Sequence, residues 1–139
     1  MGDLTVTAAQ VGACDPEKAE IVPGVAGVAI GAGEALYQIA ASGKLGLADE
    51  DASAEASHVW GMALESVGAG QGLSVLRKGA MYGFTLTGLN YGVACSLSNN
   101  PGALLDTGAT TNIVGRVMAL SDANLTKVLY IDCTLAAAS

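Results

Sequence analysis

The run Gly31-Ala32-Gly33-Glu34 has the residue types and spacing that come closest to a ligand site. It follows the apolar stretch 27–30 and precedes Glu34–Ser42, which holds good helix formers. A strand, a glycine turn and a helix in this order are typical of dinucleotide sites, where backbone N–H groups bind phosphate. The next small position is an alanine, and the chain lacks the alternating strands and long helices of such folds. A plain β-turn is therefore favoured, with a small nucleotide-binding domain as a minor alternative.

The other residues that could do chemistry are scattered along the chain. Gly68–Gly72 has the glycine content of a phosphate loop, but no Lys-Ser or Lys-Thr pair follows it, which favours a hairpin connection. His58 is the sole histidine, and a catalytic triad or metal site would need further side chains converging on it. Trp60 is expected in the core. The acids near His58 do not follow the spacing of a calcium loop and indicate a solvated loop: Asp49, Glu50, Asp51 and Glu55.

These patterns predict no catalytic, cofactor-binding or metal-binding residue, no cofactor and no enzymatic activity. The charge balance restricts the partners further. The 139 residues include 13 acidic and six basic side chains, for a net charge of −7, and the basic residues form no cluster. Nucleic acids and anionic membrane surfaces both attract clustered lysine and arginine, so neither is an expected partner. With 14% charged residues, the chain is expected to cover part of its surface with copies of itself or with a partner.

The sequence predicts neither a membrane span nor a secretion signal. The stretch 80–105 carries no charge, but it contains too many polar residues to span a bilayer. Met1-Gly2-Asp3 is not a basic start followed by an apolar run. An odd number of widely spaced cysteines suits a reducing cytoplasm, and each is expected as a small buried residue: Cys14, Cys95 and Cys133.

The elements that must position these residues are short strands. From Gly27 onward, apolar runs alternate with glycine-containing turns, and several runs show a period of two, which is typical of strands with one buried face. In the last run, one face is expected to carry Leu125, Leu129, Ile131 and Cys133, and the opposite face Thr126, Tyr130 and Asp132. We therefore predict an all-β fold: a small β-barrel or β-tulip-like body with at most one or two short helices. The two places considered for a helix are Glu34–Ser42 and Asp49–Ser57.

Residues 1–26 lack this glycine-punctuated alternation and are predicted to form an extended N-terminal arm, with residues 27–139 as a single β-rich domain. Leu4-Thr5-Val6-Thr7 is strand-like, with alternate side chains on opposite faces. Ile21 and Val22 form a second apolar piece, and the proline that follows excludes a central strand. Such a segment can add a strand to the sheet edge of a partner. The alternative is that it adds a strand to its own barrel or to a neighbouring copy.

The order of motifs resembles a known family over about residues 30–133. The resemblance lies in short strings in a fixed order: Gly33-Glu34-Ala35-Leu36-Tyr37, Ala41-Ser42-Gly43-Lys44-Leu45, the acidic Ala48-Asp49-Glu50-Asp51, Val59-Trp60-Gly61-Met62-Ala63-Leu64, Ser74-Val75-Leu76-Arg77-Lys78-Gly79, Ser98-Asn99-Asn100-Pro101-Gly102, and Val114-Gly115-Arg116-Val117. In this order they resemble the capsid decoration, or head cement, proteins of tailed bacteriophages.

The resemblance implies a homotrimer on the outer surface of the mature virion head, made in the host cytoplasm. There it would bind the major capsid protein and stabilise its lattice. The resemblance does not extend to the arm, but its strand-like pieces supply the residues expected to bind the capsid: Leu4, Thr5, Val6, Thr7, Ile21 and Val22. Two alternatives remain open, namely another phage β-module, such as a tail or spike component that binds a receptor, and the nucleotide-binding domain considered above.

Overall fold

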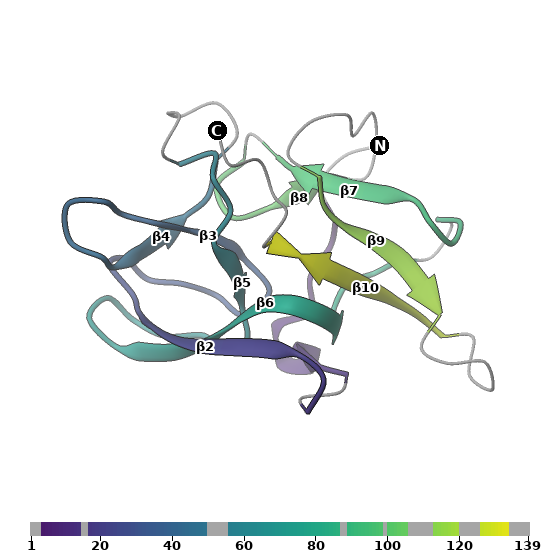
Figure 1. The fold of residues 1–139 in the computed structure, drawn as a ribbon, viewed down its shortest axis with the longest axis horizontal. Coiled ribbons are helices and arrows are strands. Elements are labelled where there is room, and N and C mark those ends of the chain that lie inside the picture. Colours follow the sequence, from purple (N-terminus) through teal and green to yellow (C-terminus); the bar gives the residue numbers. More distant parts are fainter. Residues whose placement is uncertain are drawn as a thin grey trace.

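The computed structural model of the chain describes residues 4–14, 17–49, 56–86, 89–98, 100–105, 113–119 and 126–133. These residues form a curled antiparallel sheet, which confirms the predicted all-β, barrel-like body (Figure 1). Within them, the helical structure is one 3-10 turn, η1 (Ala8–Gln10), and the single residue Cys133. The strands are β1 (Gly12–Ala13), β2 (Glu20–Val25), β3 (Ala35–Gln38), β4 (Leu45–Leu47), β5 (Gly61–Ala63), β6 (Gly72–Tyr82), β7 (Ala94–Leu97), β8 (Leu104–Leu105), β9 (Ile113–Ala119) and β10 (Lys127–Asp132).

The longest strand, β6, organises the sheet because both of its edges are covered. On one edge β5 pairs with its first half and β10 with its second half, so that Met62 lies opposite Leu76 and Leu129 opposite Met81. β5 continues through β3 to β4, while β10 continues through β9 and β7 to β8. Two wings therefore leave the same edge of β6. We call β5, β3 and β4 the short wing, and β10, β9, β7 and β8 the long wing.

Side chains alternate between two apolar cores, as strands with two buried faces require. The smaller core lies in the curl of the short wing, and the larger one joins both wings across β6. Leu129 and Ile131 of β10 and Cys133 just after it are buried, Tyr130 and Asp132 are half-buried and Thr126 is exposed, as predicted. Val128 is also buried, so the alternation holds from Leu129 onward, and Leu125 lies outside the described residues. Neighbouring residues of β3, β5 and β6 point to different cores: Leu36, Ala63 and Val75 to the smaller, and Ala35, Met62 and Leu76 to the larger.

Hydrogen bonds between distant turns hold the curl closed. Ala26, just after β2, forms a parallel bridge to Leu45, and the Gly27 N–H donates to the Leu45 carbonyl at 2.8 Å. This contact brings β2 and β4 together around the smaller core. In the turn between β7 and β8, the Gly102 N–H donates to the Ala48 carbonyl at 2.7 Å. The long wing is thus joined to the short wing at its far end as well as through β6.

The helix considered at Glu34–Ser42 is wrong, because Ala35–Gln38 forms strand β3. This segment pairs with strands on both sides and feeds side chains to both cores, and such tertiary pairing overrides helix propensity. Most of the second segment considered, Asp49–Ser57, lies outside the described residues.

The N-terminal segment belongs to the same sheet. β2 and then β1 run antiparallel along the free edge of β6, and Val6 forms a bridge to Phe84 beyond its end. Leu4 is buried, and its N–H donates to the Leu104 carbonyl of β8 at 2.8 Å. The prediction of an arm separate from residues 27–139 is therefore wrong for the described residues. The physical reason is the length of β6: an uncovered edge of 11 residues would leave a long row of unpaired backbone groups.

Candidate functional site

The turn at Gly31–Gly33 uses its N–H groups internally. The Gly31 N–H donates to Oε1 of Glu34 at 2.6 Å, and the Ala32 N–H donates to Oγ of Ser66 at 2.9 Å. The Glu34 carboxylate thus occupies the position that a phosphate would need, and its negative charge would repel one. A strand follows the turn in place of the expected helix. The geometry is that of a β-turn and gives no support to the nucleotide-binding alternative.

The second glycine-rich run is a hairpin connection, as expected. The Gly68 N–H donates to Oε1 of Gln71 at 2.7 Å, so this turn also supplies its own acceptor. Gly70 has a positive φ of 86°, which favours glycine, and its N–H donates to the Ala26 carbonyl at 2.7 Å. The run therefore joins β5 to β6 and ties the hairpin to the end of β2.

The residues considered for acid–base or metal chemistry do not converge. His58 is half-buried, and the Asp49 N–H donates to the Ala56 carbonyl at 2.9 Å. Glu50, Asp51 and Glu55 lie outside the described residues. In the part of the chain that the structure describes, no three His, Cys, Asp or Glu side chains are grouped so that they could hold a metal ion.

The six residues proposed for capsid binding divide between core and solvent. Leu4 is part of the larger core, and Ile21 and Val22 pack against the larger and the smaller core respectively. The two threonines, Thr5 and Thr7, are exposed and Val6 is half-buried, as the expected alternation requires. The core-facing apolar side chains of this segment already have partners within the chain. What the segment offers to another molecule is its outer backbone edge and its exposed side chains.

The outer edge of β2 is open at Ile21 and Pro23. β2 forms a ladder with β6 alone among the described strands. The Ala26 N–H donates toward the β6 side, to the Gln71 carbonyl at 2.9 Å, and N–H directions alternate along a strand. Ile21 and Pro23 therefore direct their backbone groups outward, whereas β4 lies against the end of this edge through the parallel bridge between Ala26 and Leu45. Pro23 has no N–H, so an outward-facing position on an edge strand is where a proline can be accommodated.

Exposed apolar side chains lie at the C-terminal end of this edge. Val25, the last residue of β2, and Val28 are each 43% exposed, and they are two of the four large apolar residues that stand out as exposed in the described chain. The other two, Tyr82 and Tyr91, lie elsewhere along the sequence. We call the outer edge of Glu20–Val25 together with Val28 the β2 edge.

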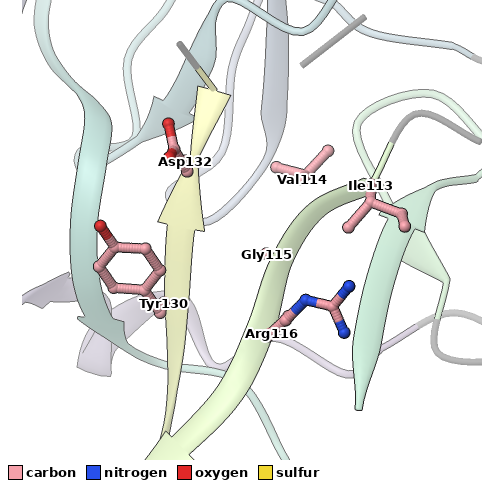
Figure 2. A pocket seen from close by; sticks show the side chains of 6 residues that line it. All are labelled: Ile113, Val114, Gly115, Arg116, Tyr130 and Asp132. Carbon is pink, nitrogen blue, oxygen red and sulfur yellow. The ribbon is translucent and has the colours of Figure 1, made fainter. Parts of the chain in front are cut away.

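Figure 2 shows a hollow of about 240 Å³ between β9 and β10. The ladder between the two strands ends where Ile131 pairs with Gly115, and the strands diverge beyond this pair. Arg116 points away from Tyr130 and donates from Nη1 to the Gly92 carbonyl at 3.1 Å. The charged and phenolic groups around the hollow therefore do not converge on one point. Gly115 allows the close approach here, since a Cβ at this position would meet the Tyr130 carbonyl oxygen.

A cluster that sequence reasoning missed surrounds Trp60. The indole is half-buried against the smaller core, and the Arg77 guanidinium carbon lies 3.8 Å from its ring centroid. Arg77 also donates from Nε to the Trp60 carbonyl at 2.9 Å. Trp60 lines a hollow of about 510 Å³ together with Gln38, Ala40, His58 and Val59. Trp60 and Arg77 are 17 positions apart, so only the pairing of β5 with β6 brings them together.

Two of the three cysteines are buried and the third is half-buried, and none of them forms a disulfide. Burial raises the pKa of Cys133 to about 12; the charge of Arg77 opposes this rise and the charge of Asp132 adds to it. Burial also raises the pKa of Cys14, and a hydrogen bond with Tyr82 partly offsets this. The thiols of Cys14 and Cys133 therefore stay protonated at neutral pH and are weak nucleophiles.

Within the described residues there is no helix with the length and apolar character of a membrane span. Comparison of the chain with protein-family models, with curated proteins and with solved structures finds no match.

Proposed function

We propose that this chain is a structural, non-enzymatic virion protein that binds the outside of the mature head of a tailed phage. It would act as a trimer and stabilise the lattice of the major capsid protein, after synthesis in the host cytoplasm. The order of sequence motifs suggests the family. The observation that carries the proposal is the β2 edge, a strand edge that is open at Ile21 and Pro23 and ends in two exposed valines.

The β2 edge suits strand addition by a partner. Its outward backbone groups are the carbonyls of Ile21 and Pro23 and the N–H group of Ile21, while β4 already lies against the end of the edge at Ala26. An extended segment of the capsid protein could pair with them, while Val25 and Val28 provide apolar contact. Because β6 already holds β2 in place, binding would cost little ordering entropy.

Pro23 favours a foreign partner over a second copy at this edge. If two copies paired antiparallel across Pro23, two residues without an N–H would face each other, and hydrogen bonds would be lost at the centre of the ladder. Prolines on edge strands limit self-association in this way. We therefore place the trimer contacts elsewhere on the molecule.

Stabilisation of the capsid would follow from mass action. A protein that binds the mature lattice and not its precursors shifts the equilibrium toward that lattice. Each contact can be weak, because many copies bridge neighbouring capsid subunits and act together.

A binding assay with purified heads that lack this protein tests the proposal. Wild-type protein should co-sediment with mature heads, and Val25→Lys combined with Val28→Lys should weaken binding by at least tenfold, or about 1.4 kcal/mol. Both valines are exposed, so these changes should leave the fold intact. Ala41→Lys, at an exposed position in the turn after β3, is the matched control and should bind like the wild type.

The proposal fails if the wild-type protein does not bind heads, or if the double variant binds as well as the control. Sedimentation of the free and head-bound protein over a range of concentrations tests the trimer. A symmetric dimer at two-fold positions of the shell would contradict it. Binding to intact cells in place of heads would favour a tail or spike module that recognises a receptor.

A further inference from the structure

The hollow beside Trp60 lies where the chain enters the short wing. Its described lining comes from the end of β3, at Gln38 and Ala40, and from the segment that leads into β5, at His58–Trp60. Its volume of about 510 Å³ is within the range of small-molecule sites, which often lie at the mouths of barrel-like sheets. The apolar interior of the curl begins directly behind Trp60, which packs against the smaller core.

The indole of Trp60 is held in a fixed position. The backbone N–H of Trp60 donates to the Leu36 carbonyl at 2.6 Å, and the Trp60 carbonyl accepts a hydrogen bond from Nε of Arg77 at 2.9 Å. The guanidinium of Arg77 also stacks over the ring, with its central carbon 3.8 Å from the centroid. Trp60 lines the hollow, whereas Arg77 does not. A platform fixed before binding costs little entropy to use.

The polar groups of the hollow can both donate and accept hydrogen bonds. Gln38 is exposed and carries an amide with two donors and one acceptor oxygen, and the half-buried His58 offers one ring nitrogen of each kind when neutral. Within the described part of the chain, no hydrogen bond joins the side chain of Gln38 or His58 to another residue. An aromatic surface next to a few polar groups of mixed type is the usual lining of a site for a small, partly polar ligand.

Three ligand classes can use an aromatic surface, and two of them fit poorly. A nucleic-acid base would bring phosphates toward a chain of net charge −7 with no basic cluster. An apolar side chain would cover Gln38 and His58 without satisfying them, at a desolvation cost. A sugar ring combines an apolar C–H face for the indole with hydroxyl groups for the amide and the imidazole. We propose that this hollow is a carbohydrate site that holds one sugar ring against Trp60.

Intrinsic fluorescence tests the proposal directly, because Trp60 is the sole tryptophan of the chain. The probes are the methyl glycosides of glucose, galactose, mannose and N-acetylglucosamine, each titrated into the full-length protein. We expect at least one glycoside to give a saturable change in Trp60 emission. For that glycoside, Gln38→Ala and His58→Ala should each raise the dissociation constant by about tenfold. Gln10→Ala, which removes an exposed amide outside the hollow, should leave it unchanged.

Three results would overturn the assignment. The first is the absence of a saturable change with every glycoside in the panel. The second is an equal change in the wild type and in both hollow variants, with their circular dichroism unaltered. The third is an adenosine titration with an affinity equal to or tighter than that of the best glycoside, because the hollow would then be a base platform. All three are independent of capsid binding, so this proposal and the one above can fail separately.

Discussion

The two edges of β6 are covered by strands of different character. β5 and β10 cover one edge, and their inward residues are fully buried, as at Met62 and Leu129. β2 and β1 cover the other, where Ile21 and Val22 are only half-buried and the outer backbone of β2 is open. The first edge is part of the core, whereas the second is also a surface. The difference indicates that the N-terminal segment stabilises the sheet while it leaves one edge available for a partner.

Replacing one side chain of β5 and one of β2 measures this difference. Met62 is fully buried and Ile21 half-buried, and both lie opposite Leu76 of β6. Met62→Ala should lower the free energy of unfolding by about 2–5 kcal/mol, because it removes buried surface and leaves a cavity. Ile21→Ala should cost about 1 kcal/mol, since that side chain is half-buried. Urea denaturation of both variants gives the two values. An equal cost would mean that the N-terminal edge is as much core as the other.

Adding one methyl group to Gly61 of β5, or to Gly72 at the start of β6, compares how closely β6 approaches β5 and β2. A Cβ on Gly61 of β5 would overlap Cγ1 of Val75 and lie 2.9 Å from the Leu76 carbonyl oxygen. Gly61→Ala should therefore cost about 1–3 kcal/mol. A Cβ on Gly72, facing β2, would have its nearest neighbour 3.7 Å away, at the Gly24 carbonyl. Gly72→Ala should change stability by no more than about 0.5 kcal/mol. Thermal denaturation distinguishes the two, and a reversed order would contradict the described packing.

The buried thiol of Cys133 should make stability depend on alkaline pH. Its pKa is raised from 9.0 to about 12 in the folded protein, so the unfolded chain loses this proton first as the pH rises. Stability is therefore complete below pH 9 and declines between pH 9 and 12, by about 1.4 kcal/mol at pH 10. Cys133→Ala removes this contribution, so its stability should fall less than that of the wild type between pH 8 and 10. Parallel curves for the two proteins would contradict the raised pKa.

The alkylation rates of the three cysteines compare the accessibility of the N-terminal edge with that of the larger core, without any mutation. Cys14 follows β1 and is half-buried, whereas Cys95 and Cys133 lie in the larger core. With a small alkylating reagent at pH 8, Cys14 should react faster than the other two by on the order of tenfold. Peptide mass spectrometry over time assigns each rate. Equal rates for the three thiols would show that the larger core opens as readily as the N-terminal edge.

The strands with buried faces could be predicted from the sequence, while the N-terminal edge could not. The period of two in residues 129–133 reflects a core face and needs no knowledge of the partner strand. β2 has no such period, because Pro23 and Gly24 interrupt it, and Ile21 and Val22 point to different cores. Its place is fixed by the length of β6, which is a property of the assembled sheet. The helix considered at Glu34–Ser42 is wrong for a related reason, because pairing of β3 with β4 and β5 is also a property of the assembled sheet.

The candidate sites follow the same rule. The two glycine-rich runs are turns, as the sequence predicts, because nearby side chains, those of Glu34 and Gln71, accept hydrogen bonds from their backbone N–H groups. The hollow beside Trp60 and the stacking of Arg77 depend on how distant strands pair, and no local pattern in the sequence signals them. Trp60 is expected in the core; in the structure it is half-buried, packs against the smaller core and also lines the hollow.

Cryo-electron microscopy of mature heads from the source virus, with and without this protein, tests the central claim most directly. The account predicts additional density as trimers at three-fold and quasi-three-fold positions on the outer surface. In each copy, the edge formed by Glu20–Val25 should lie against an extended segment of the major capsid protein. Identical maps with and without the protein, or bound copies whose β2 edge faces solvent, would contradict it.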